Sequence, residues 1–320
     1  MARCLLALGS NLGDRWSMLA SVCGALATLP ASQLLARSRW HRTAPIGGPG
    51  QQGEFLNGAV VLQTEMRPTQ LIASLHAVES RLGRQRAIRW DARLVDIDLL
   101  LYDDQQIDLP RLTVPHPRMT FRRFVLEPAV EVAGSWRHPR DGWTLSRTLA
   151  HLDRSPCCVQ LHAAQESLAP WLAAALCHRL GGTYDAHSRF GVCLRGISST
   201  AGTLESVTVG GLPANPVIHI AAGPPTKGGA LKLPAGEQTF WPSLMIVLEP
   251  DSPEELLARI GDKKEAGQKK KQKNISPNVQ ENLCLPAPGP KAIIRSSDPA
   301  TVVADAFAVL CSAWPDLAGG

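Results

Sequence analysis

Short runs that are either continuously apolar or alternate between apolar and polar residues occur several times in the first half of the chain and predict β-strands. The clearest lie at residues 3–8, 33–43 and 55–63. In the last run Phe55 and Asn57 share one face, because successive side chains of a strand point to opposite faces. An amide beside an aromatic ring on such a face is suited to reading the edge of a flat heterocycle through hydrogen bonds.

Between the predicted strands, apolar residues recur at helical spacing. Residues 15–29 predict a helix with Asp14 as its N-cap, and residues 68–82 predict a second helix with Pro68 in its first turn. The intervening residues 44–53 are rich in Gly and Pro and predict a loop. This loop either closes over a bound ligand or is an ordinary surface connection.

Two carboxylates interrupt an apolar run at residues 95–102. On a strand Asp96 and Asp98 share one face, and Val95, Ile97 and Leu99 take the other. Neighbouring carboxylates repel each other unless a cation lies between them, and a small number of oxygen ligands suits Mg²⁺. Basic residues that could bind phosphate lie just upstream: Arg84, Arg86, Arg89 and Arg93. The alternative is an accidental pair of solvated carboxylates at a strand edge.

Two single residues have the same double interpretation. Glu79 lies beside the apolar stripe of the second helix, close in sequence to the arginines, or is an exposed helix carboxylate. His116 lies between two prolines, whose rings restrict the backbone and suit a positioned side chain, or has a structural role.

The second half of the chain predicts strands that alternate with helices, which indicates an α/β layered domain. Strands are expected at residues 157–162, 243–248 and 292–294, and helices at 168–180, 252–260 and 299–314. Gly181 and Gly182 are expected to cap the first of these helices. The Lys-rich residues 263–274 predict a solvated, disordered segment within a loop at about 261–290.

Composition adds less. The 320 residues suggest about two domains. The run of apolar residues at the N-terminus is too short for a secretory signal, and no apolar run is long enough to span a membrane. The eight cysteines are scattered without a Cys-x-x-Cys pair, so neither a zinc site nor a disulfide framework is indicated, and a reducing cytoplasm is expected. The net charge of +5 comes largely from the Lys-rich run, and neither a nucleic acid nor a membrane is expected as a partner.

Taken together, an ordered set of short motifs resembles the 6-hydroxymethyl-7,8-dihydropterin pyrophosphokinase family of the folate pathway. The motifs are residues 7–13, 42–45 and 55–57, Glu79 with residues 83–86, Arg93 with residues 96–98, and residues 114–116 with Arg122 and Phe124. Each is weak alone, but the ordered set over about 150 residues is specific. The family usually carries Pro before the arginine that precedes the acidic pair, where this chain has Asp91-Ala92.

The resemblance implies a ferredoxin-like α+β sandwich with an antiparallel sheet in residues 1–152, together with roles for individual residues. Asp96 and Asp98 would hold two Mg²⁺ ions, and Arg84 and Arg93 would steady the transferred group. The pterin would be bound by Thr43, Pro45, Ile46, Phe55, Asn57 and Phe124. ATP would be contacted by Glu79, Arg86, Trp90, Arg111, Thr113, His116 and Arg122.

The implied reaction transfers the pyrophosphoryl group of ATP to the hydroxymethyl oxygen of the pterin and releases AMP. For such a transfer the protein mainly positions the reactants and neutralises charge. The alternative is a regulatory or scaffold pseudoenzyme that binds pterin or nucleotide without turnover. The paired carboxylates and the arginines favour the enzyme.

Residues 153–320 faintly resemble the P-loop deoxynucleoside and nucleotide kinases. The phosphate-binding loop is missing, because residues 163–168 read Ala-Ala-Gln-Glu-Ser-Leu where glycines and a lysine should stand. This predicts a degenerate nucleotide-kinase-like domain. It would serve as a module for self-association or for a folate-pathway partner, or else as an enzyme of unfamiliar pattern.

Overall fold

The computed structural model describes residues 1–45, 53–83, 94–153, 157–163, 167–180, 183–185, 190–193, 218–222, 231–232, 239–240, 244–260 and 289–315. The chain divides into two compact units. The first comprises Met1–Ala150 with Ser312–Ala318, and the second comprises His151–Cys311 with Gly319–Gly320.

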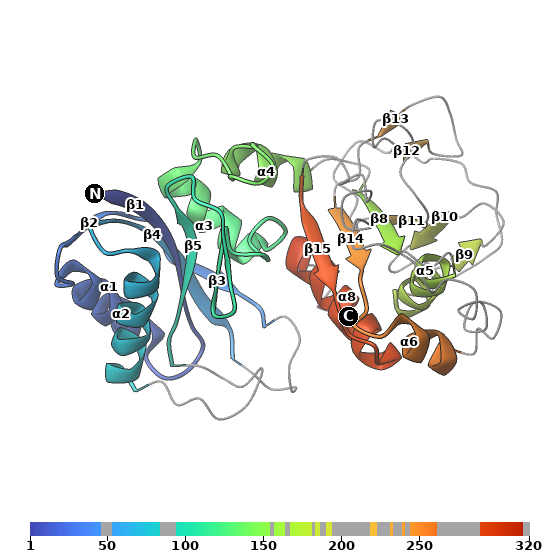
Figure 1. Cartoon of the computed structure of the whole chain (residues 1–320), viewed down its shortest axis with the longest axis horizontal. Coiled ribbons are helices and arrows are strands. Elements are labelled where there is room, and N and C mark those ends of the chain that lie inside the picture. Colours follow the sequence, from blue (N-terminus) through green and yellow to red (C-terminus); the bar gives the residue numbers. More distant parts are fainter. Residues whose placement is uncertain are drawn as a thin grey trace, which may run out of the picture. The chain divides into compact units, whose positions relative to one another are not determined.

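The N-terminal unit is an antiparallel sheet covered by helices (Figure 1). In chain order its elements are β1 (Ala2–Ser10), α1 (Arg15–Ala27), β2 (Ser32–Arg37), β3 (His41–Thr43), β4 (Phe55–Thr64), α2 (Pro68–Arg81), β5 (Asp96–Tyr102), β6 (Ile107–Leu109), β7 (Leu112–Val114), α3 (Arg123–Ala133) and α4 (Leu145–Leu152). The strand order is β2-β4-β1-β5, with β3 also paired to β4, and all of these pairings are antiparallel. The predicted α/β fold with an antiparallel sheet is confirmed for this unit.

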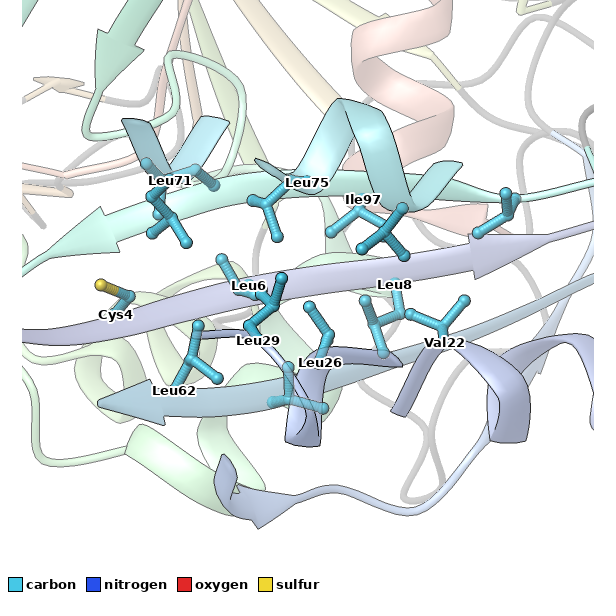
Figure 2. Packing of buried hydrophobic residues seen from close by; sticks show 14 of the residues in the cluster. Cys4, Leu6, Leu8, Val22, Leu26, Leu29, Leu62, Leu71, Leu75 and Ile97 are labelled. Atoms are coloured by element: carbon cyan, nitrogen blue, oxygen red, sulfur yellow. The ribbon is translucent and has the colours of Figure 1, made fainter. Parts of the chain in front are cut away.

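Each face of the sheet has its own apolar core. Alternate residues of β1, β4 and β5, among them Leu6, Leu62 and Ile97, pack against α1 and α2. Figure 2 shows Leu71 and Leu75 of α2 on this face. The intervening residues, such as Leu5 and Ala59, pack with Val125 and Ala129 of α3 on the other face. The alternation of side chains therefore decides which residues of each strand lie on the α3 side.

Helix starts follow the sequence closely. The Asp14 carboxylate accepts a hydrogen bond from the Ser17 backbone N–H at 3.1 Å, so Asp14 caps α1 as predicted. Pro68 is the first residue of α2, where its missing N–H costs nothing. Both helices end slightly before the predicted residues 29 and 82.

The predicted strand over residues 33–43 is two strands, β2 and β3, separated at Ser38 to Trp40. Ser38 accounts for the break, because its side-chain oxygen accepts from the Ala59 N–H at 2.9 Å and donates to the Arg39 carbonyl at 2.7 Å. The Trp40 ring occupies the space where Gly58 has no Cβ. Both strands remain paired to β4, so the sheet continues past the break.

The second unit contains a sheet in the order β15-β14-β8-β11-β10-β9. Its elements are β8 (Cys157–Ala163), α5 (Leu168–Arg179), β9 (Thr183–Asp185), β10 (Phe190–Cys193), β11 (Ile218–Ala222), β12 (Leu231–Lys232), β13 (Thr239–Phe240), β14 (Leu244–Leu248), α6 (Pro253–Ile260), β15 (Lys291–Ile294) and α8 (Pro299–Ala313). The pairings of β8 with β11 and β14, and of β14 with β15, are parallel.

All three predicted strands and all three predicted helices of this half are present, with ends shifted by a residue or two. The glycines expected to cap α5 and the Lys-rich segment lie outside the described residues. Among the described helices of both units, none is long and apolar enough to cross a membrane.

Candidate functional site

The predicted site residues of the sheet form two rows across neighbouring strands. Asn57 of β4 pairs with Gly9 of β1, and Gly9 pairs in turn with Asp96 of β5. Two residues before Gly9 in β1, on the same face, Ala7 pairs with Asp98. Because adjacent strands lie 4.7–4.9 Å apart, Asn57 and Asp96 are separated by roughly 10 Å. A floor of small side chains thus lies between an amide on one side and two carboxylates on the other.

Both carboxylates lie on the α3 side of the sheet, as the predicted alternation requires. Val95, Ile97 and Leu99 are buried in the opposite core, whereas Asp96 and Asp98 are only half-buried. The two acids are held on a seven-residue strand rather than on a loop. Their spacing is therefore set by the pleat, and a cation between the two carboxylates would offset the electrostatic repulsion between them.

Glu79 is buried, with only 1% of its surface exposed, so the exposed-carboxylate interpretation is wrong. Its Oε1 accepts a hydrogen bond from the Ile97 backbone N–H at 2.8 Å. Ile97 is the residue between the two aspartates, and β5 is the last strand of the sheet. Glu79 of α2 therefore holds the outer edge of β5 at the point that carries the acidic pair.

His116 faces the same pair. Its Nε2 lies 3.9 Å from Asp98 Oδ2, and its backbone N–H donates to the Leu100 carbonyl of β5 at 2.9 Å. Burial, followed by the positive charges of Arg122 and Arg118, lowers the pKa of His116 from 6.5 to about 3. The Arg118 backbone N–H donates to His116 Nδ1 at 3.2 Å. The neutral ring therefore carries its proton on Nε2, as a donor facing Asp98.

The amide side of the row contains the residues proposed for the pterin. Asn57 Nδ2 donates to Thr43 Oγ1 at 2.7 Å, which fixes the orientation of the amide. Phe55 pairs with Thr43 in the register of β3 and β4 and is half-buried. Phe124, near the start of α3, lies under the Arg122 guanidinium, whose Cζ is 5.5 Å from the ring centroid.

Gly9 is tightly fitted into this arrangement. A Cβ at position 9 would lie 3.1 Å from Asn57 Oδ1, closer than ordinary van der Waals contact. The absence of a side chain at Gly9 therefore lets Asn57 take its position. It also leaves no side chain protruding between Asn57 and Asp96.

The remaining predicted residues are placed less closely or not at all. Thr113 of β7 is half-buried opposite Asp108, and Arg111 is exposed in the turn between β6 and β7. Pro45 follows β3 and is half-buried. Five predicted site residues lie outside the described residues: Ile46, Arg84, Arg86, Trp90 and Arg93.

The donor set suits magnesium. The described residues hold no group of three or more His, Cys, Asp and Glu side chains with metal-binding geometry. Asp96 and Asp98 would offer two carboxylates from one face of a strand. Mg²⁺ is commonly held in this way, by one or two carboxylates together with water and substrate phosphates.

The sequence of the N-terminal unit is similar to proteins of one family. Residues 5–134 match the model of the family described as 7,8-dihydro-6-hydroxymethylpterin-pyrophosphokinase (HPPK). A 2-amino-4-hydroxy-6-hydroxymethyldihydropteridine pyrophosphokinase of Methylorubrum extorquens is 41% identical over 155 residues, covering 48% of this chain and 96% of that protein. The Pseudomonas aeruginosa protein of the same name is 40% identical over 148 residues, covering 46% and 90%.

Among solved structures, a triple mutant of HPPK-DHPS from Plasmodium falciparum matches with a TM-score of 0.39 and 11% identity. The match covers 52% of this chain and 51% of that chain, so this protein spans about half of its length. The identity to these two relatives, and the near-complete coverage of both, show that the N-terminal unit is of the pterin pyrophosphokinase class. The chain belongs to the 7,8-dihydro-6-hydroxymethylpterin-pyrophosphokinase family.

Sequence reasoning did not single out two features of this site. Gly9 lies within the first family motif, but its contact with Asn57 depends on the register of β1 and β4. The Arg118 contact with His116 uses a backbone N–H, which no residue type identifies. A search for glycines within strands would have found the first, since glycine in a strand often marks a close approach.

Proposed function

We propose that the N-terminal unit positions ATP and 6-hydroxymethyl-7,8-dihydropterin on opposite sides of Gly9. The chain is an ATP-dependent diphosphotransferase that transfers a pyrophosphoryl group from ATP to hydroxymethyldihydropterin in folate biosynthesis. The observation that carries the arrangement is the row Asn57, Gly9 and Asp96 on three neighbouring strands. In this row the Asn57 amide lies roughly 10 Å from Asp96, a distance that a two-ring pterin and its hydroxymethyl group can span.

In this arrangement Asn57, held by Thr43, reads the edge of the pterin, and Phe55 and Phe124 stack on its faces. The hydroxymethyl oxygen then points toward Asp96 and Asp98 and attacks the β-phosphorus of ATP, and AMP departs. The protein contributes alignment and charge neutralisation, which account for most of the catalysis of phosphoryl-type transfers.

Asp96 and Asp98 would hold the magnesium, and we propose two ions. When bound, they supply Lewis-acid neutralisation of the phosphate charge. His116 supports this role from its own chemistry, because a neutral ring with its proton on Nε2 donates a hydrogen bond to a phosphate oxygen without repelling a cation.

The other ATP contacts are assigned by motif. Arg122 lies over Phe124 and is positioned to bridge the two substrates. Arg111 and Thr113 would reach ATP from the β6–β7 hairpin, which is followed in the chain by His116. Glu79 would contact ATP only in addition to its hydrogen bond with Ile97. Pro45 and Ile46 would line the pterin side, and Arg84, Arg86, Trp90 and Arg93 would contact ATP and the transferred group.

A coupled assay of AMP release with ATP, magnesium and the hydroxymethyl pterin tests the proposal. Asp98→Asn is expected to fold normally, to bind the pterin and to lose most activity. Asp104→Asn is the matched control, since this exposed carboxylate lies in the turn just after β5. Equal activity of both variants with unchanged magnesium dependence would exclude the metal assignment. Pterin and ATP binding without AMP release by the wild type would instead support a regulatory pseudoenzyme.

For the second unit we propose a non-catalytic module, and a domain boundary near residue 152. Its described elements have parallel strands followed by α5, α6 and α8, as in nucleotide-binding α/β domains, while residues 163–168 lack the phosphate-binding loop. A folate-pathway partner or self-association is the proposed use. A related Lactococcus lactis protein, 35% identical over 127 residues, is named bifunctional protein FolKE, which supports a second function beside this domain.

Titration of the full chain with MgATP by calorimetry tests the second unit. One site per chain, abolished by Asp98→Asn, is expected. A second site that survives this substitution would overturn the non-catalytic assignment. The cytoplasm is the proposed location, in keeping with the thiols of Cys4 and Cys23, which form no disulfide within the part of the chain that the structure describes.

A further inference from the structure

One carboxylate on α3, that of Glu131, contacts two residues at or just before the start of β3, Arg39 and His41. Glu131 Oε2 accepts from the Arg39 backbone N–H at 2.8 Å. Its Oε1 accepts from Arg39 Nη2 at 2.9 Å and from Arg39 Nε at 3.2 Å. His41 Nε2 lies 3.0 Å from the same Oε1. Both oxygens of Glu131 are thus engaged by Arg39 and His41.

These contacts are partly shielded from water. The Glu131 side chain is 24% exposed and that of His41 is 22% exposed, although the Arg39 side chain is 85% exposed. Burial would raise the pKa of Glu131, but the hydrogen bonds from Arg39 and His41 outweigh it and lower the pKa below 4.5. The carboxylate is therefore charged at neutral pH and its hydrogen bonds are charge-assisted.

The two elements joined by Glu131 form two walls of the pterin side of the site. Arg39 lies just before β3 and His41 is the first residue of this strand, whose Thr43 orients the Asn57 amide. α3, which carries Glu131, also carries Phe124 in its first turn. Glu131, Arg39 and His41 are not among the residues proposed to contact ATP or the pterin.

β3 needs such an anchor. It has three residues, and its register pairs join it to β4 alone among the described strands. A binding site must be held to within about 0.5 Å, and a short strand at a sheet margin cannot supply this by itself. A fixed link to α3 prevents Thr43 from moving relative to Phe124 before the pterin arrives.

We propose that Glu131 is a positioning residue for the pterin, which locks the strand bearing Thr43 to the helix bearing Phe124. This inference rests on the proposed function, because it assigns the pterin to this side of the site. It does not make Glu131 a ligand of the substrate. Loss of the link is expected to weaken pterin binding selectively, while the ATP side, built on β5 and His116, is unaffected.

The test compares Glu131→Gln with Glu127→Gln in the full chain. Glu127 lies one turn earlier on α3 and makes weaker contacts, 4.0 Å from His41 Nδ1 and 3.7 Å from Arg123 Nη1. Glu131→Gln is expected to raise the KM for the pterin about tenfold, with the KM for ATP and kcat within about threefold of wild type. Glu127→Gln is expected to change none of them by more than about threefold.

Pterin binding in the absence of ATP, measured by fluorescence quenching, separates this inference from the proposed function. Wild-type AMP release tests the function, and the ratio of variant to wild-type pterin affinity tests the link. A Glu131→Gln chain with wild-type pterin affinity, or with pterin and ATP affected equally, would overturn it. If Glu131→Gln does not fold, Arg39→Gln removes the two side-chain hydrogen bonds of Arg39 to Glu131 from an exposed position and must show the same selective loss.

Discussion

Glu79 offers the sharpest separation of a structural from a ligand-binding role. Replacing it by Leu keeps a side chain of similar size at a buried position but removes the acceptor of the Ile97 N–H. That N–H then has no side-chain carboxylate at the edge of β5. A buried donor left without an acceptor costs about 1–3 kcal/mol. Glu79→Gln retains a side-chain oxygen, so its cost is limited to the loss of charge, about 1 kcal/mol.

The loss should be local, because the bond fixes one point of the outermost strand. Amide hydrogen exchange of Ile97 reports this directly, since it measures local opening. A cost of about 1–3 kcal/mol corresponds to exchange faster by roughly 5- to 150-fold. Ser80→Ala is the control, because Ser80 is exposed and its hydroxyl bonds only to the His76 carbonyl of the same helix among the described contacts.

Activity should follow, since Ile97 lies between the two aspartates. Displacement of reacting groups by about 1 Å can cost on the order of 100-fold in rate. We therefore expect kcat of Glu79→Leu to fall by roughly 10- to 100-fold and that of Glu79→Gln to fall much less. An Ile97 amide that exchanges at the wild-type rate in Glu79→Leu would exclude an anchoring role for Glu79. If Glu79→Gln raises the KM for ATP while that exchange is unchanged, direct ATP contact is its main role.

Three further outcomes are expected. Gly9→Ala brings a Cβ to 3.1 Å from Asn57 Oδ1 and should raise the pterin KM several-fold with little change for ATP; equal effects on both substrates would contradict the placement of the pterin. Gly24→Ala, in an exposed part of α1 with nothing within 4 Å of the new Cβ, should stabilise the chain by about 0.5–1 kcal/mol in urea unfolding, and destabilisation would count against it. His116 should show no NMR titration between pH 5 and 8, because its pKa is about 3. An inflection of the His116 NMR signal near pH 6.5 would refute its burial. Below pH 6.5 the unfolded chain binds the proton first, so His116 lowers stability as the pH falls toward 3.

Local pattern was sufficient for much of the N-terminal unit. The shared face of Asp96 and Asp98 depends only on strand alternation, and the cap at Asp14 depends on residue type. The break in the predicted strand at Ser38 was not predictable, because it requires Ala59, which lies 21 residues away. Propensity alone cannot distinguish one long strand from two short strands joined at a shared partner.

The burial of Glu79 shows the same limit. The helical period places it next to Val78, at the border of the apolar stripe, where the sequence permits either an exposed or a buried carboxylate. The docking of α2 against β5 decides the matter, because it brings the Ile97 N–H within reach. A carboxylate becomes acceptable in a buried position only when such a donor is present.

Short-range relations follow from local sequence alone: which side chains share a face, where helices begin, and the ordered motifs of the family. The tertiary structure alone decided which of those faces meet. The row Asn57, Gly9 and Asp96 joins three segments that are far apart in the chain, and Glu131 reaches back 92 residues to Arg39. Strand register and helix docking set these contacts, and both depend on the packing of the whole sheet rather than on any local stretch.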